Sequence, residues 1–257
     1  MQSSVHISVR DLMMSYGDFV LMQDLNFDIE RGAVFVIMGG SGCGKSTLLR
    51  HMVGLKEPAK GEIFYGDESF TLATAGRRNA ILRGCGVLYQ SGALWSSMTL
   101  AENVALPLSE FTELAPSTIR AVASLKLSLV GLRGFEDYYP SQISGGMQKR
   151  AGLARAMALD PDILFLDEPS AGLDPISCKL LDDLILELRD SLGTTIVVVS
   201  HELSSIFAIG TDSVLLDPES RTAIAHGPPR ELRDHSDNER VRRFLLRGKL
   251  DAEGEAA

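Results

Sequence analysis

The chain has 257 residues, of which 45% are hydrophobic and 23% are charged, and its formal net charge at pH 7 is −9. This length suits one large α/β domain with a small insertion. The negative charge disfavours a large non-specific surface for nucleic acid, so we expect no nucleic-acid partner. No apolar run approaches the ~20 residues of a membrane-spanning helix, and no export signal is recognisable. We therefore expect a cytoplasmic protein, or one on the cytoplasmic face of another assembly.

The three cysteines, Cys43, Cys85 and Cys178, are odd in number and far apart in the sequence. Their spacing predicts neither a zinc site nor a disulfide framework, which is consistent with a reducing compartment.

Two segments near the N-terminus, residues 5–9 and 25–29, alternate apolar and polar side chains. A period of two predicts half-exposed strands, here of an antiparallel layer. Between them Tyr16 stands in a turn-like stretch, where its ring could face outward and stack on a purine base, contributing ~1–3 kcal/mol. An isolated tyrosine beside a turn is also common as a packing residue, so this stretch alone does not assign Tyr16.

The strongest motif is the stretch GGSGCGKST at residues 39–47, which contains G-x-x-x-x-G-K-[ST]. Such a loop closes backbone N–H groups around a di- or triphosphate. The apolar run 33–38 before it predicts a buried strand of a parallel sheet. The helical spacing of apolar residues 48–53 after it predicts a helix that ends at Gly54. The candidate nucleotide-binding residues are Gly39, Gly40, Ser41, Gly42, Cys43, Gly44, Lys45, Ser46 and Thr47.

Strand, glycine loop and helix together are the context of a phosphate site. We expect Lys45 to hold the β- and γ-phosphates and Ser46 to ligate Mg²⁺, while the helix dipole adds to the attraction. Cys43 lies within this loop, either as a small residue that fits a tight turn or as a thiol whose alkylation would obstruct the nucleotide. The sequence therefore predicts binding of a nucleotide such as ATP together with Mg²⁺.

Chemically reactive side chains follow three further predicted strands. The apolar run 163–166 leads into Asp167 and Glu168, and ligands of open α/β sheets bind at that carboxyl edge. Adjacent carboxylates there are compensated if Asp167 binds Mg²⁺ and Glu168 deprotonates a water molecule. The run 194–200 leads into His201, which we expect to contact a γ-phosphate. Gln90 ends a shorter predicted strand, residues 86–90.

Residues 91–159 differ in sequence pattern from the rest of the chain. Glycine, serine and proline punctuate helical patterns and no strong strand is recognisable, so we predict a mostly helical insertion. Within it, Ser144 followed by two glycines predicts a helix start with uncovered N–H groups, a second anion site. A capped helix that binds nothing is the alternative interpretation.

The end of the chain contains a predicted hairpin, residues 214–216 and 222–225, and then a basic amphipathic helix, more compatible with docking on protein than on lipid. We expect disorder from residue 251 onward. We accordingly divide the chain into residues 1–90 (antiparallel β layer and the first part of the core), 91–159 (helical subdomain), 160–227 (the rest of the core) and 228–257 (C-terminal helix and disordered tail).

The whole series of motifs resembles the nucleotide-binding subunit of ABC transporters over nearly the entire chain. It comprises Tyr16, the loop GGSGCGKST, Gln90, SGG at 144–146, ILFLDE at 163–168, SAGLDP at 170–175 and His201. The resemblance implies a P-loop NTPase with a RecA-like α/β core, an N-terminal antiparallel β layer and an inserted helical subdomain. It also implies an ATPase that forms a head-to-tail homodimer around two ATP molecules.

The resemblance assigns roles to the candidate residues. Tyr16 would stack on adenine, Gln90 would contact Mg²⁺ and the attacking water, Glu168 would be the general base, and His201 would clamp the γ-phosphate. Residues of one copy would reach the ATP that Lys45 of the other copy holds. These trans residues would be Ser144, Gly145, Gly146, Met147, Gln148 and Asp174.

One departure bears on the subtype. The usual signature places glutamine directly after SGG, whereas Met147 follows here and Gln148 comes one residue later. With the sequences around the phosphate loop, Gln90 and His201, this is similar to the ATPase of MCE/Mla-type lipid transporters. That likeness implies a membrane permease (MlaE-like) docked between Ser91 and Ala105, an MCE substrate-binding protein, and a peripheral position on the cytoplasmic side of the inner membrane.

The cargo stays open at this stage. The likeness implies phospholipids or other hydrophobic molecules, and an importer of amino acids or another small polar solute is the alternative. A non-transport ABC ATPase of the chromosome-maintenance type would carry a long heptad insertion, and we find none in the sequence.

Overall fold

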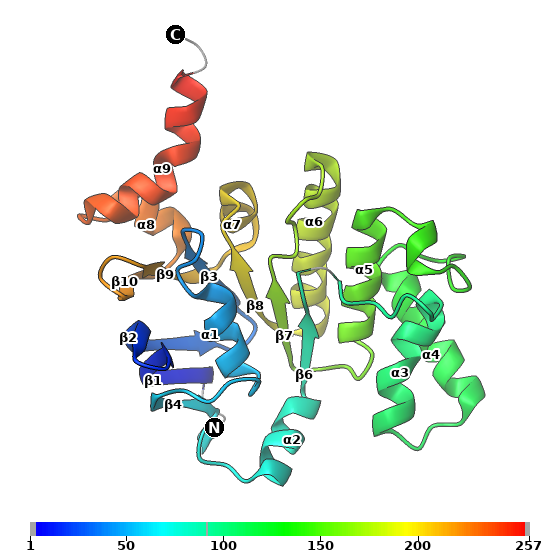
Figure 1. Ribbon diagram of the computed structural model, residues 1–257. Coiled ribbons are helices and arrows are strands. Elements are labelled where there is room, and N and C mark those ends of the chain that lie inside the picture. The colour runs from blue at the N-terminus through cyan, green and yellow to red at the C-terminus, as the bar shows by residue number, and fades with distance from the viewer. Residues whose placement is uncertain (1–3, 91, 255–257) are drawn as a thin grey trace.

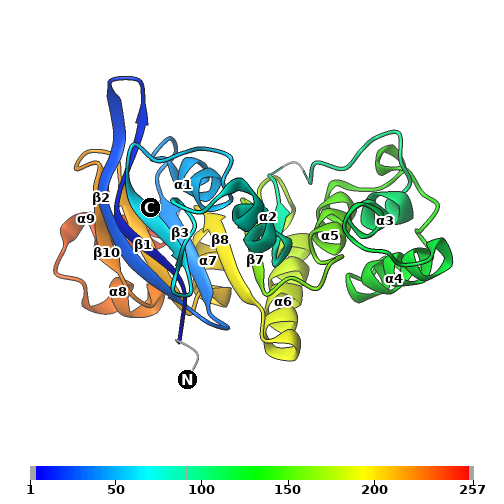
Figure 2. The same cartoon turned by 90° about the horizontal axis from the view of Figure 1, so that it is seen from below.

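The computed structural model describes residues 4–90 and 92–254 of the chain. A larger and a smaller β-sheet form one end of the molecule, and a group of helices forms the other (Figures 1 and 2). Among the described residues, no helix combines the length and the apolar character needed to cross a bilayer.

The larger sheet has the strand order β10-β9-β3-β8-β7-β6. Its strands are parallel except β10, which forms an antiparallel hairpin with β9, as the sequence predicts. All residues of β3, β7 and β8 are buried, which explains their unbroken apolar runs. The strands are β3 (Val34–Gly39), β6 (Cys85–Leu88), β7 (Ile163–Asp167), β8 (Thr195–Ser200), β9 (Asp212–Asp217) and β10 (Thr222–His226).

The smaller sheet is antiparallel and has the order β2-β1-β4-β5. It confirms the predicted N-terminal layer, because alternate residues such as Ile7 and Val9 are fully buried and pair with Ile29 and Phe27 of the next strand. The strands are β1 (Val5–Tyr16), β2 (Phe19–Glu30), β4 (Lys60–Tyr65) and β5 (Glu68–Ser69).

Strand β3 separates two apolar clusters because its successive side chains face opposite sides of the sheet. Phe35 and Ile37 pack in one cluster with the smaller sheet and with α1 (Lys45–Met52). Val36 and Met38 pack on the other face with α7 (Leu203–Ile209) and α9 (Glu239–Gly254). The phosphate loop therefore leaves a strand that is fixed on both faces.

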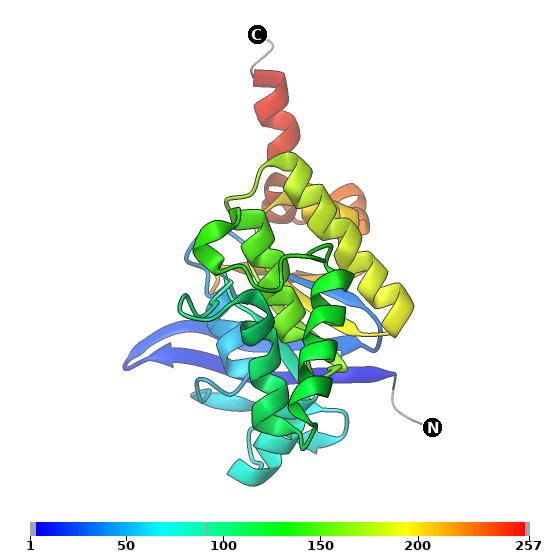
Figure 3. The same ribbon diagram turned by 90° about the vertical axis from the view of Figure 1, so that its right-hand side faces the viewer.

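The predicted helical insertion is confirmed as a group of helices at the end of the molecule away from the smaller sheet (Figures 1 and 3). Its apolar side chains form one cluster with α6 and with the even-numbered residues of β7 and β8. A capping box between the Thr99 side chain and Glu102 starts its first helix. The elements are α3 (Leu100–Phe111), α4 (Pro116–Leu129), the 3₁₀ turn η1 (Pro140–Gln142), α5 (Gly145–Ala156) and, beside them, α6 (Pro175–Leu192).

Several boundaries differ from the sequence prediction. Strand β6 ends at Leu88, so Gln90 lies two residues beyond the strand, in a turn, rather than at its last position. Helix α9 continues to Gly254, so residues 251–254 are helical where we expected disorder; no proline interrupts them. Residues 255–257 of the expected tail lie outside the described residues. The helices α2 (Ala75–Arg83), α7 and α8 (Pro229–His235) were not predicted.

A buried histidine joins the two sheets. The ring of His6 on β1 is 8% exposed, and its Nδ1 is hydrogen-bonded at 2.7 Å to Oγ1 of Thr195 on β8. Thr195 Oγ1 also accepts a hydrogen bond from Gly32 N at 2.9 Å. Burial, with a smaller effect of the Arg31 guanidinium, lowers the pKa of His6 to about 4.

The lowered pKa of His6 makes stability depend on pH. Because an unfolded chain binds the proton near pH 6.5 and the folded chain does so near pH 4, the contribution is complete above pH 6.5 and is lost progressively between these values. As the pH falls through this range, protonation of His6 should lower the free energy of unfolding by about 3 kcal/mol. Urea denaturation at pH 7 and pH 4.5 measures this loss. His6→Gln should remove it, and an equal loss in the variant and the natural protein would contradict the prediction.

Candidate nucleotide site

The loop between β3 and α1 is an open cradle. Gly42 and Gly44 have φ values of +76° and +91°, a left-handed region that favours glycine. A Cβ added to Gly40 or Gly42 would meet no atom within 4 Å, so both residues border open space. Helix α1 starts at Lys45, directly after Gly44, with no side-chain cap and no acidic residue in its first turn. Its first N–H groups are therefore available to an anion.

Cys43 packs beneath this cradle. Its side chain is fully buried, and a Cβ on Gly39 would lie 2.5 Å from the Cys43 sulfur. Burial raises the pKa of the Cys43 thiol, which makes it a poor nucleophile. These contacts favour the interpretation of Cys43 as a small packing residue of a tight loop.

Lys45 and Ser46, adjacent residues of the motif, both form hydrogen bonds within the site. Lys45 is 7% exposed, and its Nζ donates hydrogen bonds to the carbonyl oxygens of Gly39 (3.1 Å) and Gly40 (3.0 Å). Ser46 Oγ donates to Asp167 Oδ1 at 2.8 Å. The fold thus brings the end of β7 directly beside the phosphate loop.

The predicted catalytic residues of two strand ends also meet here. The Glu168 side chain is 9% exposed, and its Oε1 lies 3.9 Å from Lys45 Nζ. His201 Nδ1 donates to the same carboxylate, at 2.8 Å from Oε1 and 2.9 Å from Oε2. A lysine at the start of α1 and the glutamate and histidine that follow β7 and β8 therefore lie at one edge of the sheet.

The protein oxygens suit Mg²⁺ when phosphate supplies further ligands. Ser46 Oγ and Asp167 Oδ1 are adjacent, whereas no cluster of three or more His, Cys, Asp or Glu side chains suited to a metal occurs in the described part of the chain. Mg²⁺ in nucleotide sites takes one or two protein ligands and completes its octahedron with phosphate oxygens and water. The donor set therefore fits Mg²⁺ bound together with a nucleotide.

Tyr16 forms a wall of the same site. A cavity of about 270 Å³ is lined by Tyr16, Leu21 and residues of the phosphate loop and the start of α1. The Tyr16 ring is 51% exposed, and its hydroxyl lies 3.2 Å from Thr47 Oγ1. The Lys56 ammonium lies 3.1 Å from the centre of the ring, a cation–π contact that the sequence did not reveal. The ring is thus fixed beside the phosphate cradle.

Gln90 contacts the site through its backbone. Its side chain is exposed, and its carbonyl oxygen accepts a hydrogen bond from Lys149 Nζ. The same ammonium donates to the carbonyl oxygen of Glu168 at 3.1 Å. Sequence reasoning missed Lys149; the signal available was a cation in the first turns of the helix that starts at Ser144.

The signature residues lie on the start of α5 and adjoin the start of α6. The Ser144 hydroxyl accepts a hydrogen bond from Met147 N at 3.3 Å, so Ser144 caps α5 as predicted. A Cβ on Gly146 would lie 3.3 Å from Ser177 Oγ, which in turn donates to Asp174 Oδ2 at 2.5 Å. Asp174 and the signature are therefore neighbours, and none of them lines the phosphate cavity.

Two of the predicted trans residues contact their own subdomain. The side-chain amide of Gln148 donates to the carbonyl oxygens of Pro140 (2.9 Å) and Ile143 (3.4 Å), and Met147 packs against the helical cluster. The open start of α5 is formed by Gly145, where an added Cβ would meet no atom within 4 Å.

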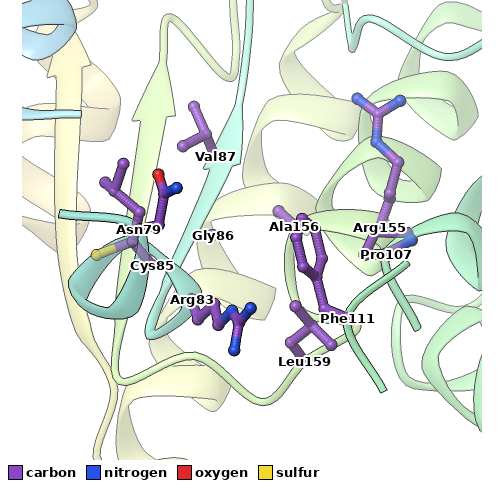
Figure 4. A pocket seen from close by; sticks show the side chains of 11 residues that line it. Asn79, Arg83, Cys85, Gly86, Val87, Pro107, Phe111, Arg155, Ala156 and Leu159 are labelled. Carbon is purple, nitrogen blue, oxygen red and sulfur yellow. The ribbon is translucent and has the colours of Figure 1, made fainter. Parts of the chain in front are cut away.

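A larger cleft lies between the core and the helical subdomain (Figure 4). Its volume is about 490 Å³, and its walls carry Arg83 of α2, Val87 of β6 and Phe111 of α3, together with Arg155 of α5 and Leu159. The Phe111 ring is 56% exposed, with the Arg83 guanidinium 5.8 Å from its centre.

A glycine cradle at a helix start, a lysine, a serine–aspartate pair and a glutamate at the carboxyl edge of a parallel sheet define the class of P-loop nucleoside triphosphatases. The family model for ABC transporters matches residues 22–171. The chain belongs to this family, as its motifs predicted, and is an ABC ATPase.

Curated relatives match nearly the whole chain. It is 39% identical over 239 residues to the intermembrane phospholipid transport system ATP-binding protein MlaF of Escherichia coli K12, covering 93% of this chain and 88% of the relative. It is 40% identical over 245 residues to the probable ribonucleotide transport ATP-binding protein mkl of Mycobacterium leprae, covering 95% of this chain and 70% of the relative.

Solved structures confirm the predicted fold. A dimeric post-hydrolysis state of the ATP-binding cassette MJ0796, bound to ADP and Pi, matches with a TM-score of 0.78 and 28% identity, over 86% of this chain and 97% of that one. The structure of cbiO1 from Clostridium perfringens matches with a TM-score of 0.83 over 99% of both chains, and at 24% identity it supports the fold alone.

Proposed function

We propose that this ABC ATPase works as a homodimer that encloses two MgATP and drives a membrane permease for phospholipid or another hydrophobic molecule. The observation that carries the proposal is the separation of two anion sites within one chain. The phosphate cradle has its lysine, metal ligands and base close by. The open start of α5 lies beside Asp174 instead, and neither the signature residues nor Asp174 line the phosphate cavity. A second copy in head-to-tail orientation would supply the trans residues to the cradle of the first: Ser144, Gly145, Gly146, Met147, Gln148 and Asp174.

The residues at the sheet edge can carry out hydrolysis. Lys45 and the first N–H groups of α1 would hold the phosphates, and Mg²⁺ on Ser46 and Asp167 would neutralise charge on the β- and γ-oxygens. Lys45 now binds Gly39 and Gly40 and also lies near Glu168. When Lys45 turns to the phosphates and His201 to the γ-phosphate, the Glu168 carboxylate is freed to accept a proton from the attacking water.

The cleft between core and helical subdomain suits a segment of the permease. We expected the contact near residues 91–105; Ser91 lies outside the described residues. The cleft is lined by Pro107 and Phe111, which follow this stretch, and by none of residues 92–105. Arg155, on the cleft wall, donates hydrogen bonds to Gly92 O (3.1 Å) and Ala93 O (2.8 Å). An occupant of the cleft would thereby act on the turn that contains Gln90 and couple transport to hydrolysis.

The cargo and the remaining partners are inferred from the relatives. The name of the MlaF relative refers to phospholipid transport, and we propose the same cargo class, an MCE substrate-binding protein in the complex, and a peripheral position on the cytoplasmic side of the inner membrane. The mkl relative is named for ribonucleotides. An importer of a small polar solute is therefore the second candidate.

Replacement of the proposed base should separate chemistry from binding. Glu168→Gln keeps the shape of the side chain and its hydrogen bond to His201 but cannot accept the proton of water, so we expect ATP turnover to fall by about 10²–10⁴-fold. Affinity for a fluorescent ATP analogue should stay within about threefold, because the cradle is unchanged. Glu187→Gln, on the exposed side of α6, is the matched control. Undiminished turnover of Glu168→Gln would remove Glu168 from this role.

Disruption of the cleft should release the partners. Phe111→Glu removes the exposed aromatic side chain from the cleft wall and puts a hydrated carboxylate in its place, so the variant should lose the permease, and with it the bound cargo, when the complex is purified from detergent. Mass spectrometry of co-purified proteins and lipids measures both losses. Leu125→Glu, which changes a side chain of similar exposure on α4, should retain them. Full recovery of the permease with Phe111→Glu would exclude the cleft, and a polar solute in place of lipid would favour the importer.

A further inference from the structure

A buried cation on α5 contacts both loops that carry the proposed catalytic groups. Lys149 is 7% exposed, and its ammonium donates hydrogen bonds to the carbonyl oxygens of Gln90 and Glu168, the latter at 3.1 Å. Gln90 and Glu168 are the residues to which we assign the water contact and the proton acceptor. The roles described above leave Lys149 without a function.

Packing alone does not account for a lysine at this position. Burial lowers the pKa of Lys149, with the Glu168 and Asp167 carboxylates acting in the opposite direction. The two hydrogen-bond acceptors of the ammonium are neutral carbonyl groups. A buried charge of this kind costs more than a methionine of similar volume. The ammonium instead fixes the distance between the backbone of Gln90 and the backbone of Glu168.

The backbone of Glu168 needs such support. Glu168 has φ +48°, a left-handed conformation that is unfavourable for a residue with a side chain. Its N–H donates to Val199 O at 2.9 Å, and its carbonyl oxygen accepts from Ala171 N at 3.2 Å as well as from Lys149. Lys149 therefore helps to hold the peptide that aims the carboxylate.

The other contact of Lys149 belongs to a turn that lies along α5. Gly152 packs against this turn, because a Cβ added there would lie 3.0 Å from Gly92 O. Arg155, farther along the helix, binds the carbonyl oxygens of Gly92 and Ala93. A shift of α5 would thus carry the turn with it, and Lys149 would transmit the shift to Glu168.

We propose that Lys149 is a positioning residue for ATP hydrolysis: it joins the turn at Gln90 to the peptide of Glu168, so that both follow the helix whose start bears Ser144. The proposal rests on the roles proposed above for Gln90 and Glu168. It predicts that the position of α5 controls the alignment of the Glu168 carboxylate. A second copy that contacts the signature at the start of α5 would therefore act on the base.

Turnover of the full-length chain tests the proposal first. Lys149→Met keeps the volume and removes the hydrogen bonds, so kcat should fall by about tenfold or more while KM for ATP changes by less than about threefold. Lys149→Arg, which can donate to both carbonyl oxygens, should restore most of kcat. Lys126→Met is the matched control, because Lys126 is 5% exposed and bonds Asp160 away from the nucleotide site. An unchanged kcat in Lys149→Met would overturn the proposal.

Hydrogen exchange without nucleotide supplies a measurement independent of activity. In Lys149→Met, amide exchange should rise by tenfold or more in peptides covering residues 88–95 and 165–171, while exchange in α5 stays unchanged. Lys126→Met should raise exchange in neither peptide. Uniform faster exchange along α5 would overturn the proposal, because it would mean that Lys149 stabilises the helix only. If Glu168→Gln kept full turnover, the base assignment would fail, while this local exchange would still test the link to Glu168.

Discussion

Each reactive side chain at the carboxyl edge of the larger sheet is held by a protein partner, and in our account these contacts rearrange when MgATP binds. Lys45 binds the carbonyl oxygens of its own loop, Ser46 binds Asp167, and His201 binds Glu168. A buried charge needs such partners, since an unpaired one is costly. The rest of the structure serves this arrangement: β3 is fixed on both faces, and the glycine conformations of the loop leave the start of α1 open.

The second anion site explains why one chain is not sufficient in our account. The start of α5 has a serine cap and glycines that leave its N–H groups accessible, yet its neighbours are Asp174 and Ser177 rather than the phosphate cradle. The same helix holds the turn after Gln90 through Arg155 and reaches Glu168 through Lys149. Helix α5 thereby connects the signature at its start, the cleft wall at Arg155 and the base Glu168.

The sequence predicted the elements whose signals are local. The phosphate loop, the buried strands before it and before Asp167, and the cap at Ser144 each combine a periodic pattern with a specific residue. Helix α2 was missed because none of its residues is buried, so it has no apolar period. The family, the fold and the ATPase class followed from the combination of motifs, and the comparisons confirm them.

The contacts that could not be predicted join residues distant in the sequence. Lys149 contacts Gln90 and Glu168 from another element, and Lys56 covers Tyr16 from beyond the end of α1. Neither pair has a local pattern, because the approach of the side chains depends on how whole elements pack. Gln148 was predicted from the signature alone, and the signature does not indicate that its amide binds the turn before α5.

The central claim is that each ATP site is formed by two copies of the chain. One copy contributes the phosphate cradle and the other contributes the signature at the start of α5. Sedimentation of Glu168→Gln with MgATP, alone and combined with Ser144→Arg, tests this claim directly. Our account predicts that Glu168→Gln forms a dimer with two nucleotides. The double variant, which places a bulky side chain at the start of α5, should bind nucleotide and stay monomeric. Nucleotide-saturated monomers of Glu168→Gln, or dimers of equal stability in the double variant, would contradict it.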